Sequence, residues 1–177
     1  MSSITVRAAQ PGDGEAIARQ SRDSAEYYRE LAPDDFRLPD EEGRAAWLDS
    51  FLPADGEREV ALVSELDGDV VGYLEARVEE PLDSARYQAH PDLGERRLIV
   101  NALLTARAHW RKGVGSALVQ AAEAWGRERG ATVAVMDTYA YSPVSVPFWE
   151  GRGYRTHAVI MRKRLDRREE GRWLSSS

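Results

Sequence analysis

The chain has 177 residues, 42% of them hydrophobic and 31% charged, which is the composition of one globular domain and not of a disordered chain. No apolar run approaches the roughly 20 residues that a spanning helix needs, and residues 1–6 show no signal-peptide pattern, so we expect a cytoplasmic protein without a membrane partner. The absence of cysteine excludes disulfides and thiol nucleophiles, and three widely spaced histidines argue against a metal site.

The formal net charge of −6 is distributed unevenly. Residues 1–95 carry 9 arginines against 23 acidic residues, whereas residues 96–177 carry 15 basic residues against 7 acidic ones. Two interpretations stay open: the halves form ligand surfaces of opposite charge, or they neutralise each other across the fold.

Hydrophobic periodicity and turn residues predict an alternation of strands and helices. The strands are expected at residues 4–8, 60–65, 70–78, 98–106, 132–139 and 154–165. The helices are expected at 14–28, 40–52, 114–130 and 144–152. A polar surface loop is expected at 79–97. This order predicts one mixed α/β domain.

The sequence predicts how the first two helices begin and which side of the second is apolar. Asp13 stands where an N-cap of the first helix is expected. The second helix is expected to begin with acidic residues 40–42 and to present an apolar stripe, formed by Trp47, Leu48, Phe51 and Leu52.

Segment 110–116 lies between a predicted strand and an amphipathic helix. The free amides and the dipole of a helix start attract an anion, and Gly113 and Gly115 allow a phosphate to approach the backbone closely. Arg111 and Lys112 add positive charge. A plain turn needs one glycine at most, so phosphate binding is favoured. A dinucleotide fingerprint would need a third glycine where Leu118 stands, and no Walker loop is present.

Several segments together resemble the GNAT N-acetyltransferase superfamily. Residues 101–105, the loop 110–116 and the helix after it are similar to the family's acetyl-CoA motif. Further similar segments are Val6-Arg7-Ala8, Pro11-Gly12-Asp13, Val70-Val71-Gly72-Tyr73-Leu74, Asp137-Thr138-Tyr139, Ser142-Pro143, Ser145, Phe148-Trp149-Glu150 and Gly153-Tyr154. The resemblance covers about residues 4–165 and implies a single-domain GNAT acyl-CoA N-acyltransferase fold, a mixed central sheet flanked by about four helices. Residues 166–177 are expected to form a disordered tail.

The resemblance implies an acetyl-CoA-dependent N-acetyltransferase, in which a primary amine of a small molecule or peptide attacks the acetyl group directly. A backbone amide near 103–105 would polarise the acetyl carbonyl. The implied cofactor-binding residues are Leu103, Leu104, Thr105, Arg111, Lys112, Gly113, Val114, Gly115, Ser116, Ser142 and Trp149. No metal and no nucleic acid are implied, and a homodimer is left open.

The chain departs from the family pattern at four places. Trp110 replaces an arginine or glutamine, and Ser142 replaces an asparagine. Trp149 stands where many members carry the tyrosine that protonates the leaving thiolate, and an indole does not titrate. A thiol is a fair leaving group without assistance, and Tyr139 and Tyr141 are expected either to stand in as the donor or to be packed aromatic residues.

The fourth departure is that the fourth strand carries no acid, and its polar candidates are Asn101 and Thr105, with Glu95 just before the strand. Asn101 is expected either to hold a relay water or to be an ordinary hydrogen-bonded strand residue. Asn101 and Tyr139 are therefore the predicted catalytic residues. The alternatives are a catalytically degenerate acyl-CoA-binding domain and a nucleotide-binding module.

The acidic half of the chain has two interpretations. A group of acids, Asp34, Asp35, Asp40, Glu41 and Glu42, forms either a solvated face or the rim of an acceptor entrance that favours a cationic amine.

Overall fold

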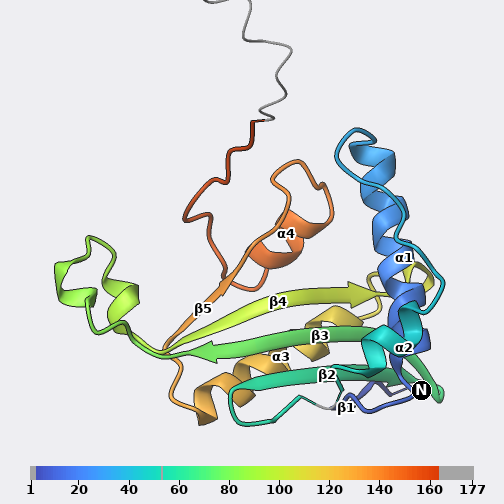
Figure 1. The fold of residues 1–177 in the computed structure, drawn as a ribbon, viewed down its shortest axis with the longest axis horizontal. Coiled ribbons are helices and arrows are strands. Elements are labelled where there is room, and N and C mark those ends of the chain that lie inside the picture. Colours follow the sequence, from blue (N-terminus) through green and yellow to red (C-terminus); the bar gives the residue numbers. More distant parts are fainter. Residues whose placement is uncertain (1–2, 53, 164–177) are drawn as a thin grey trace, which may run out of the picture. The chain divides into compact units, whose positions relative to one another are not determined.

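The computed structural model describes residues 3–52 and 54–163, which form two compact units divided between Ser142 and Pro143. The first unit is built on a five-stranded sheet of order β1-β2-β3-β4-β5 (Figure 1). Its strands are β1 (Thr5–Ala8), β2 (Glu59–Leu66), β3 (Asp69–Glu79), β4 (Arg97–Thr105) and β5 (Val133–Met136). The first four strands are antiparallel neighbours, and β5 runs parallel to β4. The mixed sheet predicted from the sequence is therefore confirmed.

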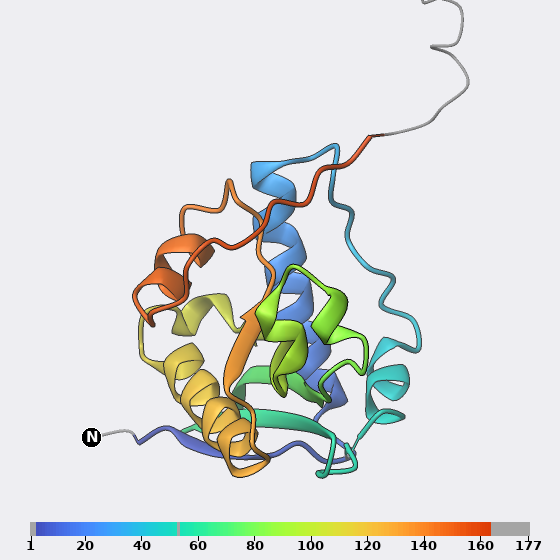
Figure 2. The ribbon, with the colours of Figure 1, turned by 90° about the vertical axis from the view of Figure 1, so that its left-hand side faces the viewer.

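Helices cover both faces of this sheet. α1 (Gly14–Leu31) and α2 (Arg44–Asp49) precede the β2–β3 hairpin, and α3 (Val114–Glu128) connects β4 to β5. Gly72 of β3 faces α3, because a Cβ on it would contact Val114 and Leu118, whereas the next residue, Tyr73, packs with Ile17 of α1. Successive strand residues point to opposite faces, so α1 and α3 lie on opposite sides of the sheet (Figure 2).

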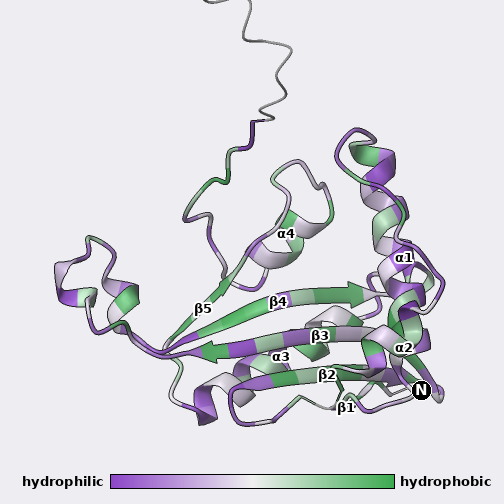
Figure 3. Ribbon diagram, in the orientation of Figure 1, coloured by the Kyte–Doolittle hydropathy of each residue, from purple (hydrophilic) through white to green (hydrophobic). Residues whose placement is uncertain are grey.

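The apolar residues of the sheet form the core of the first unit. β4 is hydrophobic along most of its length, while β3 alternates between apolar and charged residues (Figure 3). On the α1 side the buried cluster consists of Ala9, Ile17, Leu52, Ala61, Val63 and Tyr73. The alternation on β3 also places a strip of charged residues on this face, formed by Glu75, Arg77 and Glu79.

The second unit contains one helix, α4 (Ser145–Glu150), followed by a turn. The strand predicted at 154–165 is wrong for its described part, because residues 154–163 form no helix or strand. Val159, Ile160 and Met161 are 74%, 82% and 91% exposed. A strand requires a neighbour that accepts and donates its backbone hydrogen bonds, and an apolar sequence pattern does not supply one. Residues 164–177, including the predicted tail, lie outside the described residues.

The 79–97 connection is irregular, as predicted, apart from two short 3₁₀ turns at Ala85–Tyr87 and Pro91–Gly94. No helix in the described ranges, 3–52 and 54–163, is long and apolar enough to cross a membrane.

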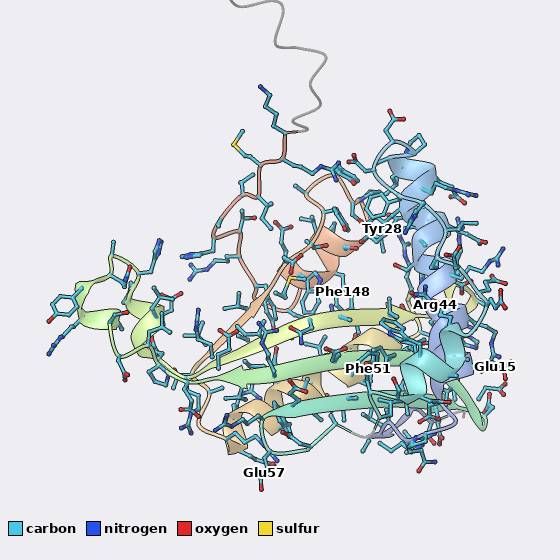
Figure 4. The ribbon with its side chains drawn as sticks, in the orientation of Figure 1. Glu15, Tyr28, Arg44, Phe51, Glu57 and Phe148 are labelled. Atoms are coloured by element: carbon cyan, nitrogen blue, oxygen red, sulfur yellow. The ribbon has the colours of Figure 1, made fainter. Side chains whose placement is uncertain are left out.

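The apolar stripe predicted for the second helix is only half correct. α2 begins at Arg44, after Gly43 with a φ of 71°, so the acidic residues 40–42 precede the helix. Leu48 of α2, and Leu52 beyond its end, pack with the core. Trp47 and Phe51 are 58% and 59% exposed, and Phe51 is labelled beside α2 in Figure 4. In so short a helix, only one side can reach the sheet.

The cap of α1 is supplied by a different residue from the one expected. Asp13 occupies the N-cap position, yet its carboxylate binds Arg7 at 2.7 and 2.9 Å and the amide of Gln10 at 2.9 Å. Asp49 at the end of α2 instead accepts hydrogen bonds from the amides of Gly12 and Gly14 at 2.9 and 2.8 Å. Because Asp49 is 35 residues away from Gly14, this cap depends on tertiary structure.

The Arg7–Asp13 pair predicts a pH-dependent contribution to stability. The hydrogen bonds from Arg7 hold the pKa of Asp13 below its ordinary value. A lowered pKa stabilises the fold above the unfolded-state pKa of about 3.9, and this stabilisation disappears as the pH falls through the folded-state value. Asp13→Asn is therefore expected to lower the free energy of unfolding by about 2 kcal/mol at pH 7. Urea unfolding at pH 7 and at pH 3 measures the loss, and the difference from wild type should shrink at pH 3.

Asp83→Asn, at an exposed carboxylate in the 79–97 loop, is the control and should not change stability at either pH. A difference between Asp13→Asn and wild type that is the same at both pH values would contradict this explanation.

Candidate active site

The parallel pairing of β4 with β5 ends halfway along β4. The four pairs run from Arg97–Val133 to Val100–Met136, and within the described part of the chain residues 102–105 pair with β3 alone. The amide of Ala106 donates to Val71 of β3 at 2.9 Å. Since backbone groups alternate along a strand, the amides of Leu103 and Thr105 point away from β3, toward the side that β5 has left. This side of β4 is an open edge with hydrogen-bonding groups.

Asn101 marks the point where the open edge begins. The β3–β4 register shifts there, because Glu75 pairs with Ala102 while Ala76 pairs with Val100, so Asn101 is the extra residue of a β-bulge. Its side chain is exposed and is bonded at both ends: Oδ1 accepts from Arg77, and Nδ2 donates to Glu75 at 3.1 Å. Both ends of the Asn101 side-chain amide are therefore engaged by protein side chains in this structure, at the position where a relay water is one of the expectations.

Glu75 is a functional candidate that the sequence reasoning missed. Its carboxylate is partly buried and also accepts a hydrogen bond from the Tyr73 hydroxyl at 3.1 Å. Burial, together with the neighbouring Glu75 charge, raises the pKa of Tyr73, so this phenol remains a proton donor to Glu75. The period-2 pattern of residues 73–79 contained the signal, since it places Tyr73, Glu75, Arg77 and Glu79 on one face. Glu75 lies on the third strand, whereas the family resemblance directs attention to an acid on the fourth.

Trp110, which departs from the family motif, connects the end of β4 to α1. Its indole N–H donates to the carbonyl of Thr105 at 3.0 Å, and its ring meets Tyr27 edge-on with centroids 5.0 Å apart. The Arg107 guanidinium lies 5.9 Å from the ring centroid and is paired with Glu30. One carbonyl of the open edge is thereby satisfied by Trp110.

The glycine-containing turn directly precedes α3. Arg111 and Gly113 have φ angles of 62° and 89°, and the exposed segment 111–113 leads into the helix start. Val114 is 1% exposed and anchors the first turn of α3, whose ladder begins with the Ala117 amide donating to Gly113 at 3.0 Å. Gly115 lies inside this first turn. The positive end of the helix dipole therefore adjoins two basic side chains, Arg111 and Lys112.

Tyr139, the predicted proton donor, belongs to an aromatic cluster. Its ring lies 4.8 Å from that of Tyr28, 4.7 Å from that of Phe36 and 5.8 Å from that of Tyr141. Tyr28 projects from the C-terminal half of α1 (Figure 4), and the Tyr139 side chain remains 47% exposed. Ser142 is 2% exposed, and its hydroxyl lies 3.3 Å from the Tyr27 hydroxyl. In this structure its hydroxyl is engaged by α1.

In the second unit, Trp149 is 6% exposed. Its ring packs edge-on against Phe148 and Tyr154, with centroid separations of 5.2 and 4.9 Å. The indole is held in place by its own unit, which gives this position a packing role.

The acidic residues 34, 35 and 40–42 are all exposed. Glu41 pairs with Arg22 of α1. Among the residues that the structure describes, three ion pairs join the acidic and the basic halves of the sequence, namely Arg107–Glu30, Arg96–Glu80 and Arg97–Glu79. Part of the charge asymmetry is therefore neutralised across the fold. No cluster of three or more potential metal-ligating side chains occurs among the residues that the structure describes.

The amino-acid sequence matches the model of a known protein family. Residues 24–154, about three quarters of the chain, match the model of the acetyltransferase (GNAT) family. The chain belongs to the GNAT acetyltransferase family. No curated protein sequence matches the chain. The family membership accounts for the predicted order of strands, turn and helix.

Solved structures share the GNAT fold of this chain. A mutant of the BH1408 protein of Bacillus halodurans has a TM-score of 0.78 at 16% identity, covering 91% of this chain and 99% of that one. The aminoglycoside N-acetyltransferase AAC(6')-Iy in complex with CoA has a TM-score of 0.63 at 16% identity, covering 93% and 97%. An aminoglycoside acetyltransferase from an uncultured soil metagenomic sample, in complex with sisomicin, has a TM-score of 0.62 at 15% identity, covering 92% and 96%. At these identities the likeness concerns the fold.

Proposed function

We propose that this GNAT protein transfers the acetyl group of acetyl-CoA to a primary amine by direct attack. The observation that carries the proposal is the open edge of β4, which adjoins a glycine-containing turn at the start of α3. The turn offers Arg111, Lys112 and the first amides of α3 to phosphates. The open edge offers the amides of Leu103 and Thr105 to the acetyl carbonyl. These two features supply the two contacts that an acyl-CoA requires.

The acceptor side of the reaction requires a proton acceptor. An alkyl ammonium with a pKa of about 10.4 costs about 4.6 kcal/mol to deprotonate at pH 7. Direct attack therefore needs a general base near the acetyl group. The thiol of CoA should resemble a cysteine thiol, with a pKa of about 8.5, so its thiolate can leave without a strong acid. Trp149 therefore need not donate a proton. Tyr139 remains the proposed donor when one is used.

An amine-panel assay tests this function. The purified full-length chain is mixed with acetyl-CoA and with polyamines, aminoglycosides or peptides with a free N-terminus; thiol release and the acetylated product are measured. Aminoglycosides belong in the panel because two structural neighbours are aminoglycoside acetyltransferases. Amine-dependent thiol release with an acetylated product supports the proposal. CoA binding without turnover of any amine favours the degenerate acyl-CoA-binding domain, and stronger thermal stabilisation by ADP or NAD than by CoA favours a nucleotide module.

The exposed acidic residues 40–42 predict a preference for cationic acceptors. Reversing both charges with Glu41→Lys and Glu42→Lys is expected to raise KM for a polyamine several-fold and to leave KM for acetyl-CoA unchanged. The effect should fade at ionic strengths above about 0.1 M, because exposed charges are screened there. Steady-state kinetics at low and high salt measure it. Glu128→Lys, 75% exposed at the end of α3, is the matched control. An effect on acetyl-CoA alone would place the acidic residues away from the acceptor.

A further inference from the structure

Two carboxylates on the same face of β3 differ in the charge of their partners. Glu79 accepts hydrogen bonds from two guanidinium groups, those of Arg77 at 2.7 Å and Arg97 at 2.8 Å. From the described residues, Glu75 accepts hydrogen bonds from two neutral groups, the Tyr73 hydroxyl and the Asn101 amide, both at 3.1 Å. Across residues 3–52 and 54–163, no cation forms an ion pair with Glu75. The charge of Glu79 is therefore compensated, whereas that of Glu75 is not.

Asn101 bridges Glu75 and the guanidinium of Arg77. Its Oδ1 accepts from Arg77 while its Nδ2 donates to Glu75. Glu75 and Arg77 are two residues apart on one strand and face, so their side chains would be within reach of each other without this amide. A side-chain amide is both donor and acceptor, which allows it to bind a cation and an anion at once. The bulge at Asn101 brings the amide to this position.

The uncompensated carboxylate lies next to the open edge of β4. Glu75 pairs with Ala102, and the following residue, Leu103, directs its amide toward the side that β5 has left. An ammonium group that approaches an acetyl carbonyl held by this amide would come close to Glu75. The negative charge would attract it, and the carboxylate would be able to take its proton.

We infer, on the basis of the proposed function, that Glu75 accepts the proton of the attacking ammonium and that Asn101 is a positioning residue that keeps Arg77 from neutralising Glu75. Glu75 takes one proton from R–NH₃⁺, which frees the nitrogen lone pair. The nitrogen forms a bond to the acetyl carbon, and the carbon–sulfur bond breaks with its electron pair on sulfur. The second proton lost from nitrogen passes to the thiolate, so the products are an N-acetyl amine, CoA thiol and protonated Glu75, which releases its proton to solvent.

The other groups around Glu75 leave this assignment unchanged. On β3 its neighbours are Tyr73, a proton donor, and Arg77; on β2 its partner is the apolar Ala61. Glu59 of β2 pairs with Arg77 in register and is exposed. The residues of α1, of α2 and of the segment after α2 that share the core cluster with Tyr73 are apolar, namely Ile17, Leu48 and Leu52. Arg77 is thus the cation whose separation from Glu75 controls the carboxylate.

The first test compares the two carboxylates by isosteric substitution. Glu75→Gln is expected to lower kcat for the best amine of the panel about 100-fold, which is the low end for loss of a general base, while CoA affinity is retained. Glu79→Gln is the matched control, since it lies on the same strand and face, and should leave kcat nearly unchanged. Full activity of Glu75→Gln, or an equal loss in both variants, would overturn the role of Glu75.

The second test examines Asn101. In Asn101→Ala, Arg77 is expected to pair with Glu75, which lowers the pKa of that carboxyl and weakens it as a base. Carbon-13 NMR titration of Glu75 should therefore show a lower pKa than in wild type, and kcat should fall. Asn101→Ala combined with Arg77→Met should restore both. An unchanged titration, or a loss of kcat that Arg77→Met does not rescue, would reduce Asn101 to a structural role.

Failure of the proposed function can be distinguished from failure of the roles assigned to Glu75 and Asn101. If the wild-type protein acetylates no amine in the panel, transferase activity is refuted and with it the proton transfer to Glu75. The NMR titration needs no turnover and still decides whether Asn101 separates Arg77 from Glu75.

Discussion

Replacing Gly113 with valine is expected to weaken CoA binding by about tenfold or more. Gly113 has a φ of 89°, a region that a β-branched residue avoids, so the turn would shift and displace the first amides of α3. Among the described residues, a Cβ there would meet Ile4 alone, at 3.6 Å, so the added side chain would occupy the space proposed for a phosphate. Isothermal titration with CoA measures the loss, and urea unfolding measures stability.

Two further variants separate the turn from general strain. Gly68 has nearly the same φ, 91°, and no atom of the described residues would lie within 4 Å of its added Cβ. Gly68→Val should therefore cost a similar stability, about 1–2 kcal/mol, without weakening CoA binding. Gly115→Val places the branched side chain in the first turn of α3, where no positive φ is required, and should also weaken binding. If Gly113→Val and Gly115→Val both bind CoA as wild type does, the assignment of the turn to phosphates is wrong.

Replacing Gly72 with alanine is expected to lower the free energy of unfolding by about 1–3 kcal/mol, the usual range for an overpacked core. A Cβ at Gly72 would lie 2.5 Å from the Ser64 hydroxyl, 2.6 Å from Val114 and 2.9 Å from Leu118. All three side chains are at most 1% exposed, so none can move into solvent. The clash would push α3 away from β3, and CoA affinity should fall together with stability. Urea unfolding and CoA titration of the same variant check both effects.

Gly94→Ala is the matched control for this substitution. Its Cβ would make only an ordinary contact, 3.5 Å from Ala85, in the 79–97 loop. Its stability should remain within about 0.5 kcal/mol of wild type. A Gly72→Ala protein as stable as Gly94→Ala would show that α3 does not pack on β3 as closely as described.

The predicted site residues fall into two groups: those whose conformation depends on neighbours in the sequence, and those that contact segments distant in the sequence. The turn at Gly113 and the start of α3 at Val114 are where the sequence predicted them, because a glycine pair followed by helical periodicity is a local signal. Ser142 and Trp149 are buried, the former beside Tyr27, which is 115 residues away. Their assignment to CoA binding remains a prediction, because a motif match does not show which groups a side chain contacts in the folded protein.

By itself, the sequence determined the order of the elements from β1 to α4, the β2–β3 hairpin, the turn before α3 and the family. These features depend on periodicity, turn residues and short motifs, which act over a few neighbouring residues. Only the tertiary structure decided that Asp49 and not Asp13 caps α1, that Trp47 and Phe51 face outward, and that no strand forms at 154–163. It also decided that a bulge brings Asn101 between Arg77 and Glu75. These outcomes depend on which strand or helix arrives as a neighbour, because caps, strand pairing and polar networks join residues distant in the sequence.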